Sequence, residues 1–459
     1  MPIALSTLAF VCASLFASYC PAADGWRAGA AKAAITPTQP MWMAGYASRK
    51  RPAEGKATDL WAKALVLEDA QKNRGVVVTL DLVGIDRELA RPLRQKIADK
   101  LGLKLGQVMV CTSHTHSGPV VAKNLRPMHY LVLDESQRKQ VDEYAQTLEQ
   151  TVLRVVDEAL QRLTPAKVSQ ASGTCTVAVN RRNNKEPEVV ADQDRSTLQG
   201  PSDYDVPVLA AHDADGKLIA VAFGYACHAT VLDGFVWSGD YPAYAQMALE
   251  ERYPGATALF WAGCGGDQNP LPRRKQEYAE KYGKQLADSV QQAIQAGTKP
   301  IEPRLEATYE EIELPLGRLP TRDELVNQSR DTNIYVANRA KHLLQQLDAG
   351  KPLAQSYPYP IGVWKLGDEI DWTFLGGEVV VDYALRLKAE GRDKRTWVAA
   401  YSNDVMAYIP SRRVLAEGGY EGGGSMVYYG LPTIWDEKVE ATIVDAAARL
   451  KAQLWKAKP

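Results

Sequence analysis

The chain has 459 residues, of which 46% are hydrophobic and 24% are charged, enough for one large globular domain or roughly two to three ordinary ones. Its 54 basic and 55 acidic residues nearly cancel and leave a net charge of −1. This balance argues against a nucleic-acid-binding surface and against a polybasic membrane patch.

The first 23 residues have the pattern of a secretory signal peptide. Residues 3–20 are apolar or small throughout, and Pro21-Ala22-Ala23 leads into polar Asp24, which predicts cleavage near Ala23. No Lys or Arg precedes the apolar run, so a membrane anchor and a misplaced start codon remain alternatives. No later segment approaches the ~20 apolar residues of a spanning helix. We therefore expect residues 24–459 to be exported, to the periplasm or outside the cell, with no stable membrane span.

Four cysteines lie outside the signal peptide, each within an apolar segment. Their spacing forms neither a disulfide framework nor the Cys-x-x-Cys pairs of a structural zinc site. We expect buried free thiols at Cys111, Cys175, Cys227 and Cys264.

Strand and helix patterns alternate along the rest of the chain. Strands are predicted at 26–36, 60–69, 75–81, 104–111, 168–179, 206–212, 218–228, 256–261, 304–314, 370–375 and 397–401. Helices are predicted at 87–102, 135–163, 241–253, 274–295, 321–347, from 379 onward and at 434–455. With no repeat and no convincing linker, this order predicts one α/β domain, a mixed β-sheet core flanked by helices.

Two histidines follow the strand predicted at 104–111, in the segment Ser113-His114-Thr115-His116-Ser117-Gly118-Pro119. In an extended segment, residues at i and i+2 point to the same face, so both imidazoles can be aimed at one point. Imidazole is a common metal ligand, although a hydrogen-bonded packing pair explains the same pattern. The preceding β-α-β unit places the pair at a strand's carboxyl end, where open α/β sheets bind ligands.

Other strand ends carry polar residues of the same kind. The strand predicted at 218–228 also ends on a histidine, His228, and two strands ending in His fit a metal site assembled across a sheet. The Gly-rich segment 262–270 follows another strand, and it reads equally as a tight turn or as a close backbone approach to a ligand. Glu378 comes after the strand predicted at 370–375 and the pair Gly376-Gly377. It is either a carboxylate ligand or an acidic residue in the first turn of the next helix. Asp240 is a weaker candidate for orienting a ligand histidine, since a solvated turn acid explains it as well.

Together these motifs resemble the neutral/alkaline (non-lysosomal) ceramidase family. The resemblance rests on the His-x-His segment 113–119, Asn180-Arg181, Ala226-Cys227-His228, Gly266-Asp267, Gly377-Glu378 and the segment 402–409. Their order and spacing run through nearly all of residues 25–430, and Thr-His-Ser-Gly-Pro is the most specific of them.

The resemblance implies a set of site residues. A single zinc ion would be held by His114, His228, Glu378 and Tyr408. The second motif histidine, His116, would assist catalysis beside the zinc, and Tyr420 matches the family tyrosine near the reacting carbonyl. Asn180 and Arg181 match a family pair close to the substrate.

Two departures from the family pattern bear on the substrate. Ceramidases carry a serine, regarded as the nucleophile, in a Gly-Asp-x-Ser-Pro context, whereas this sequence reads Gly266-Asp267-Gln268-Asn269-Pro270. The family also continues into a C-terminal β domain, while this sequence has one helix after its Gly-rich segment 418–424. Asn269 cannot form an acyl-enzyme, but its amide can donate to a developing oxyanion.

The sequence thus predicts an exported zinc hydrolase that cleaves an N-acyl amide of a small or lipid-like substrate with zinc-activated water. In this mechanism His116 or Tyr420 moves the proton or donates to the oxyanion. The alternatives are a genuine neutral ceramidase of sphingolipid metabolism, a zinc esterase or deacylase acting on a non-lipid substrate, and a non-catalytic protein with a closed structural zinc site.

Overall fold

The structure is a computed structural model that describes residues 25–391 and 396–455. The expected signal peptide lies outside the described residues. Among those described, no helix is long and apolar enough to span a membrane. The four cysteines are buried and free, as expected.

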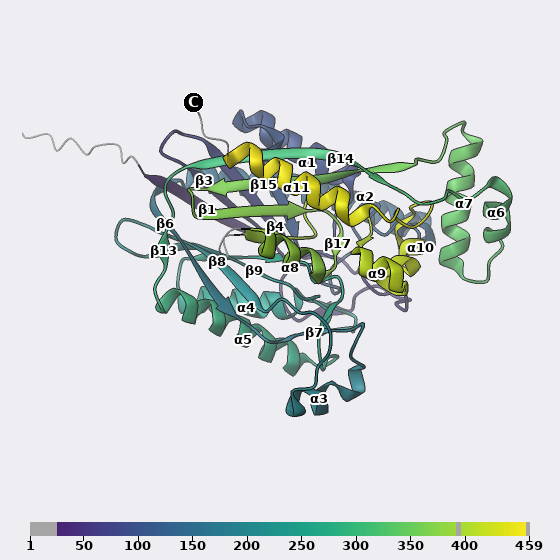
Figure 1. The fold of residues 1–459 in the computed structure, drawn as a ribbon, viewed down its shortest axis with the longest axis horizontal. Coiled ribbons are helices and arrows are strands. Elements are labelled where there is room, and N and C mark those ends of the chain that lie inside the picture. The colour runs from purple at the N-terminus through teal and green to yellow at the C-terminus, as the bar shows by residue number, and fades with distance from the viewer. Residues whose placement is uncertain (1–24, 392–395, 456–459) are drawn as a thin grey trace, which may run out of the picture.

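Two mixed β-sheets form the centre of the molecule (Figure 1). Within the described residues the larger has the order β11-β9-β8-β6-β1-β3-β4-β5, with β13 paired to β6. Its strands are β1 (Trp26–Ala34), β3 (Trp61–Glu68), β4 (Arg74–Leu80), β5 (Val108–Thr112), β6 (Thr164–Thr174), β8 (Asp205–His212), β9 (Leu218–Tyr225), β11 (Thr257–Ala262) and β13 (Lys299–Pro300). The smaller sheet contains β14 (Leu305–Pro315), β15 (Ser356–Leu366), β16 (Ile370–Leu375) and β18 (Thr396–Ala399).

Three short strand pairs lie at the end of the molecule that carries the candidate site. They are β2 (Gly55–Lys56) with β10 (Val236–Trp237), β7 (Ala178–Asn180) with β12 (Gln268–Pro270), and β17 (Glu378–Val379) with β19 (Tyr408–Ile409).

The α-helices of the described residues lie around the two sheets, and several of them cover the outer faces. They are α1 (Arg87–Leu101), α2 (Glu135–Gln161), α3 (Val189–Arg195), α4 (Asp240–Arg252), α5 (Gln276–Gln295), α6 (Arg322–Gln328), α7 (Ile334–Asp348), α8 (Val381–Glu390), α9 (Arg412–Glu417), α10 (Met426–Tyr429) and α11 (Val439–Trp455). Helices α1, α2, α4 and α5 contact the larger sheet, and α8 and α11 contact the smaller one. The layers are therefore helix, sheet, sheet, helix, which agrees with the predicted fold class.

A tryptophan-rich core joins the two sheets. Trp261 of β11 lies 4.5 Å from Trp372 of β16 between ring centroids, and Trp372 lies 5.6 Å from Trp397 of β18. Alternate residues of β11 face opposite ways: Leu259 and Trp261 face this core, and Phe260 faces the helices. A strand buried on both faces carries apolar residues continuously, which is why these segments read as apolar runs.

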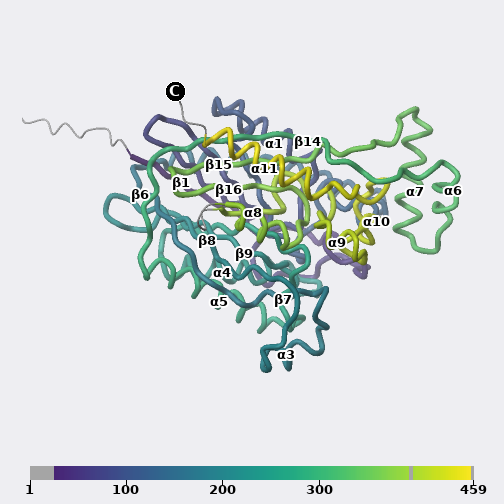
Figure 2. The backbone as a smooth tube through the Cα atoms, viewed as in Figure 1, coloured from purple at the N-terminus to yellow at the C-terminus, as the bar shows by residue number. Residues whose placement is uncertain are grey.

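Several predicted elements needed correction. The helix expected at 321–347 is two helices, because Asn333 accepts a hydrogen bond from the Tyr335 amide and caps a new helix. Figure 2 shows this pair, α6 and α7, projecting from the main body. The strand expected at 168–179 is β6 followed by the separate β7, and β15 and α3 were not predicted.

The larger sheet is strongly curled, and this curl brings the site together. Its two halves pair between β1 and β6 over only three residue pairs, and the edge strand β11 also contacts β3, β4 and β5. In a flat sheet β5 and β9 would point in opposite directions, given the antiparallel pairings between them. Instead, a parallel bridge between Thr115 and Ala229 joins the segments that follow them.

Candidate metal centre

Five side chains meet where the segments after β5 and β9 approach β17 and β19. Glu378 Oε2 lies 3.1 Å from the Nε2 atoms of both His114 and His228. His228 Nε2 lies 3.1 Å from Tyr408 Oη, and His114 Nε2 lies 3.1 Å from His116 Nε2. Glu378 and Tyr408 are direct cross-strand neighbours in the β17–β19 pair. All four residues expected to hold a metal, and His116, are thus gathered in one place.

The His-x-His pair reaches this point by a different route from the one predicted. Strand β5 ends at Thr112, and His114 has a φ of +59°, a left-handed conformation that is rare outside glycine. The two imidazoles converge because of this turn, not because side chains alternate along a strand. His228 likewise lies in a loop, three residues after β9 ends at Tyr225.

Backbone carbonyls fix the orientation of two of the imidazoles. His114 Nδ1 lies 2.5 Å from the Val83 carbonyl oxygen, and His228 Nδ1 lies 2.6 Å from that of Gly265. A carbonyl oxygen can only accept a hydrogen bond, so each Nδ1 carries the proton and each Nε2 presents a lone pair to the centre. Asp240 plays no part in this: it is fully buried and accepts bonds from the Leu232 and Tyr241 amides, so it is neither a solvated turn acid nor a partner of these histidines.

Burial sets the protonation of the donors. Burial lowers the pKa of His228 to about 4, with a further contribution from the charge of Arg181, and it lowers the pKa of His116 well below the usual value. Burial alone would raise the pKa of the Glu378 carboxyl, but His114 and His228 hold it well below its usual range. At neutral pH the site therefore presents neutral imidazoles at His116 and His228 and a carboxylate at Glu378, the forms that bind a metal.

The donor atoms fit a metal ion. Neighbouring ligands of a tetrahedral zinc lie about 3.3 Å apart, because each is about 2.0 Å from the ion. The contacts of 3.1 Å among His114, His228, Glu378 and Tyr408 are close to this spacing. The buried group His114, His116 and His228, whose ligand atoms lie within 4.8 Å of one another, could also hold a metal.

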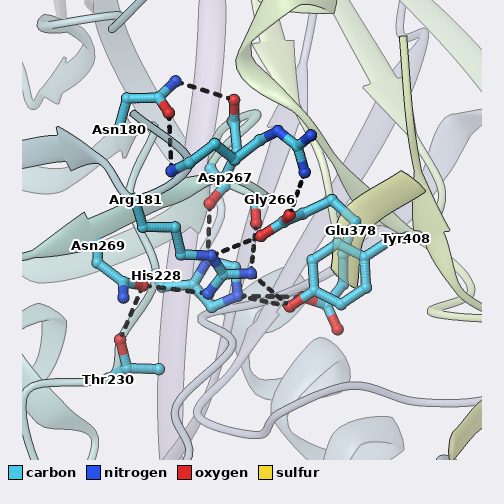
Figure 3. A network of polar contacts seen from close by, with 12 residues as sticks. Asn180, Arg181, His228, Thr230, Gly266, Asp267, Asn269, Glu378 and Tyr408 are labelled. Carbon is cyan, nitrogen blue, oxygen red and sulfur yellow. Dashed lines mark hydrogen bonds and ion pairs between the residues drawn. The ribbon is translucent and has the colours of Figure 1, made fainter. Parts of the chain in front are cut away.

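Arg181 connects the donors to the rest of the site (Figure 3). Its Nη2 donates to Tyr408 Oη at 3.0 Å and to the Gly266 carbonyl at 2.8 Å, and its Nε donates to Glu421 at 2.8 Å. Glu421, which the sequence did not single out, also accepts a bond of 2.6 Å from Arg182 and is 5% exposed. Because Glu421 directly follows Tyr420, this ion-pair group holds Tyr420 beside Tyr408, with a ring-centroid distance of 5.3 Å.

Asn180 lies in the same network but faces away from the donors. Its amide nitrogen donates to Asp267 at 3.1 Å and to the Pro201 carbonyl at 3.0 Å, while its oxygen accepts from the Arg182 amide. Asp267 in turn accepts from the Val381 amide at 2.9 Å. Asn180 therefore fixes the loop that carries Arg181, and its substrate contact stays a prediction.

Comparison with known proteins places the chain in a family. The family model for the N-terminal part of neutral/alkaline non-lysosomal ceramidases matches residues 26–271, more than half of the chain. The chain belongs to this family. Among curated relatives of this ceramidase-family chain, the neutral ceramidases of Drosophila pseudoobscura pseudoobscura and Pseudomonas aeruginosa are 24% and 26% identical over 58% of the chain. The chain spans only 39% and 40% of those proteins.

Solved structures show that this ceramidase-family chain shares the fold as well. A ceramidase complexed with C2 superposes with a TM-score of 0.72, covering 95% of this chain and 76% of that one at 20% identity. The neutral ceramidase of Pseudomonas aeruginosa superposes with a TM-score of 0.71, covering 95% and 75%.

Asn269, which the resemblance sets at the family serine position, lies on β12 and contacts Arg181. Asn269 Oδ1 accepts from Arg181 Nη1 at 3.2 Å and from Thr230 Oγ1 at 3.5 Å. These contacts use the oxygen, which leaves the NH2 group as the donor of the side chain. The Gly-rich segment before it packs closely against other loops: a Cβ at Gly265 would lie 2.7 Å from the Cys227 amide nitrogen. The Gln268 amide donates to the Gly265 carbonyl at 2.9 Å, so the segment contains a tight turn, and an approach of its backbone to a ligand stays a prediction.

Three further residues of this ceramidase-family chain contact the centre and were not predicted. The Tyr429 hydroxyl donates to Glu378 Oε1, and the Tyr46 ring lies 4.9 Å from that of His116. A Cβ at Gly45, which has a φ of +99°, would lie 2.5 Å from His116 Cγ, so only glycine fits there. These contacts join segments far apart in the sequence, and no local pattern marks them.

A buried carboxyl near this centre makes stability depend on pH. Burial raises the pKa of Asp404 to about 7 from 3.8, against the opposing hydrogen bond from Tyr357. A carboxyl whose pKa is higher in the folded state stabilises the fold fully below its unfolded pKa and loses that contribution as pH rises. We expect Asp404→Asn to flatten the decline in the free energy of unfolding between about pH 4 and pH 7, measured by urea denaturation. The control Asp215→Asn, at an exposed turn, should leave the decline unchanged, and an unchanged slope in Asp404→Asn would contradict the assignment.

Proposed function

We propose that this protein is an exported, zinc-dependent hydrolase that cleaves an N-acyl amide bond by attack of water. The observation that carries the proposal is the convergence of His114, His228, Glu378 and Tyr408, with both imidazole Nε2 atoms free to coordinate. Nitrogen and oxygen donors at near-tetrahedral spacing suit zinc. Family membership supplies the amide class of the reaction, and the signal-like residues 1–23 support export.

A bound zinc would polarise the scissile carbonyl and lower the pKa of a coordinated water to about 7. The protein's own residues would manage the protons and the charge. His116 Nε2 faces the donors, 3.1 Å from His114 Nε2, so His116 can take the proton of the attacking water through this atom. Tyr420 and the Asn269 amide can donate to the oxygen on which negative charge develops.

An open cleft beside the donors favours an enzyme over a closed structural site. The cleft has a volume of about 540 Å³, and Arg181, Asn269 and Tyr420 line it. Arg181 also bonds the donor Tyr408, so a lining residue of the cleft contacts the group of donors. A structural zinc site needs no such approach for a substrate.

The direct test is metal analysis of the purified protein, followed by hydrolysis assays on a panel of N-acyl amides and matched esters. We expect about one zinc per chain, amide hydrolysis that chelation abolishes, and recovery on adding zinc. Hydrolysis that survives complete metal removal would contradict the proposal. Faster cleavage of the esters would favour the esterase alternative. Cell fractionation tests export, which a wholly cytoplasmic location would contradict.

The kinetics should show no covalent intermediate. Asn269 stands where the family has its serine, and an amide cannot become acylated, so water must attack directly. Rapid mixing with a chromogenic amide should therefore give linear product release without a burst. An acyl group trapped on any serine of the chain would overturn this prediction, and Asn269→Ala serves as the control that removes the amide without adding a hydroxyl.

Ceramide itself remains the second candidate substrate, because the matched relatives are neutral ceramidases. Asn269→Ser restores the family residue and tests whether it alone limits ceramide turnover. We expect this variant to gain no measurable release of fatty acid from a short-chain ceramide, because the cleft has one aliphatic residue, Leu271, in its lining. Clear ceramide turnover by the variant or by the unmodified protein would contradict the expectation.

A further inference from the structure

The cleft beside the donors is lined by charged and polar side chains. Its lining residues are Arg181, Arg182, Asn184, Lys185, Glu186, Asn269, Leu271, Arg273, Tyr420 and Glu421. Leu271 is the one aliphatic side chain among them, and it is 2% exposed. A cleft that holds an alkyl chain needs a continuous apolar lining, which these residues do not provide.

The lining carries more positive than negative charge. Four of its side chains are cationic and two are carboxylates. Both carboxylates are already engaged with cations: Glu421 with Arg181 and Arg182, and Glu186 with Arg273. Two further carboxylates that pair with these cations, those of Glu188 and Glu417, have side chains 57% and 43% exposed and do not line the cleft. The Asp240 carboxyl also interacts with Arg273, but it is buried outside the cleft lining and accepts hydrogen bonds from the Leu232 and Tyr241 amides. Solvent and salt screen such exposed charges, so the interior of the cleft attracts anions.

Two of the cations have donors left for a ligand. Arg273 bonds Glu186 through Nε and Nη2, and its Nη1 has no bond or ion pair to the described residues. Lys185 has a single contact of 3.5 Å with exposed Glu188. Both cations line the same cleft as Asn269 and Tyr420, the residues proposed to donate to the developing negative charge.

We propose that Arg273 and Lys185 bind a carboxylate of the substrate, so that the enzyme acts on N-acylated amino acids or N-acylated peptides. This inference rests on the proposed amide hydrolysis and assigns its substrate class. A guanidinium presents fixed N–H donors that match a carboxylate, and the ammonium adds a second, flexible donor. A ceramide is uncharged and offers these cations no carboxylate, and its two alkyl chains would meet one aliphatic lining residue, Leu271.

The first experiment compares two substrates that differ only by the anion. N-butanoylglycine and N-butanoyl-ethylamine (N-ethylbutanamide) have the same scissile amide and nearly the same size. The first carries a carboxylate where the second carries a methyl group. With zinc-loaded protein at low salt, we expect kcat/KM for N-butanoylglycine to exceed that for the neutral analogue by about 10-fold, the effect of one charge-assisted hydrogen bond. The preference should shrink as salt is added. Equal kcat/KM values would overturn the proposal.

The second experiment removes the cation that we assign. Arg273→Gln should raise KM for N-butanoylglycine about 10-fold and leave the neutral analogue unchanged, which also shows that the variant is folded. The matched control is Arg274→Gln, because Arg274 adjoins it in sequence and also pairs with Glu186, but it does not line the cleft. In Arg274→Gln, KM should change by less than about 2-fold for N-butanoylglycine and for the neutral analogue. An equal loss for both substrates in Arg273→Gln would indicate a structural role and contradict the proposal.

Binding measurements separate this inference from the proposed function. If neither compound is cleaved, amide hydrolysis fails for this pair, and calorimetric titration of the zinc-loaded protein with each compound still measures recognition of the carboxylate. Tighter binding of N-butanoylglycine, lost in Arg273→Gln, would support the carboxylate site without the reaction. Equal binding or no binding of both compounds would overturn it.

Discussion

His228→Ala should abolish zinc binding and lower amide hydrolysis by at least about 1,000-fold, because it removes one of the four converging donors. The imidazole is held by the Gly265 carbonyl on one side and faces Glu378 and Tyr408 on the other, so its removal also leaves these two groups without their shared neighbour. Inductively coupled plasma mass spectrometry and steady-state kinetics check both effects.

The control for this prediction is His212→Ala. His212 ends β8, is partly exposed and lies outside the metal-competent group of histidines. It should retain zinc and full activity. If His228→Ala kept full zinc occupancy, the ligand assignment would be wrong, even if the activity fell.

The local features of the fold were predictable where one physical signal dominated. The strand predicted at 75–81 is β4, since Val76, Val77 and Val78 are buried on both faces. The hairpin between β8 and β9 follows from its Asp-Gly turn, in which Gly216 has a φ of +81°. The prediction failed where a capping residue interrupted a helical pattern, as Asn333 does between α6 and α7.

The geometry of the site could not be predicted from local signals. Strand ends bearing histidines were visible in the sequence, but their meeting depends on the curl of the larger sheet and on the left-handed turn at His114. Glu378 was visible as a carboxylate at a strand end, whereas Tyr408 was named only through the family resemblance; their pairing in β17–β19 places the two side by side. Glu421 contacts Arg181 across 240 residues of sequence, so only the folded chain reveals it.

The Arg181–Glu421 pair has a second role, because it joins stability to the position of the site. Arg181 contacts the donor Tyr408, Asn269, the Gly-rich loop and Glu421, the residue after Tyr420. Its side chain is 19% exposed and that of Glu421 is 5% exposed, so the pair is largely withdrawn from water. Burial alone would lower the pKa of Arg181, but Tyr408 and Glu421 hold it well above its usual value.

Arg181→Met should therefore lower the free energy of unfolding by about 3 kcal/mol. The buried Glu421 carboxylate would lose one of its two cationic partners and keep only Arg182. Urea denaturation in the presence of a chelator measures this effect without the contribution of the metal. The double variant Arg181→Met/Glu421→Met removes both charges. Its loss of stability should be smaller, by at least about 1 kcal/mol, than the sum of the losses of the two single variants. Arg195→Met, on exposed α3 with a side chain 64% exposed, should change stability by less than about 0.5 kcal/mol. Strictly additive losses would show that the two charges do not stabilise each other, and the placement of Tyr420 would then require another explanation.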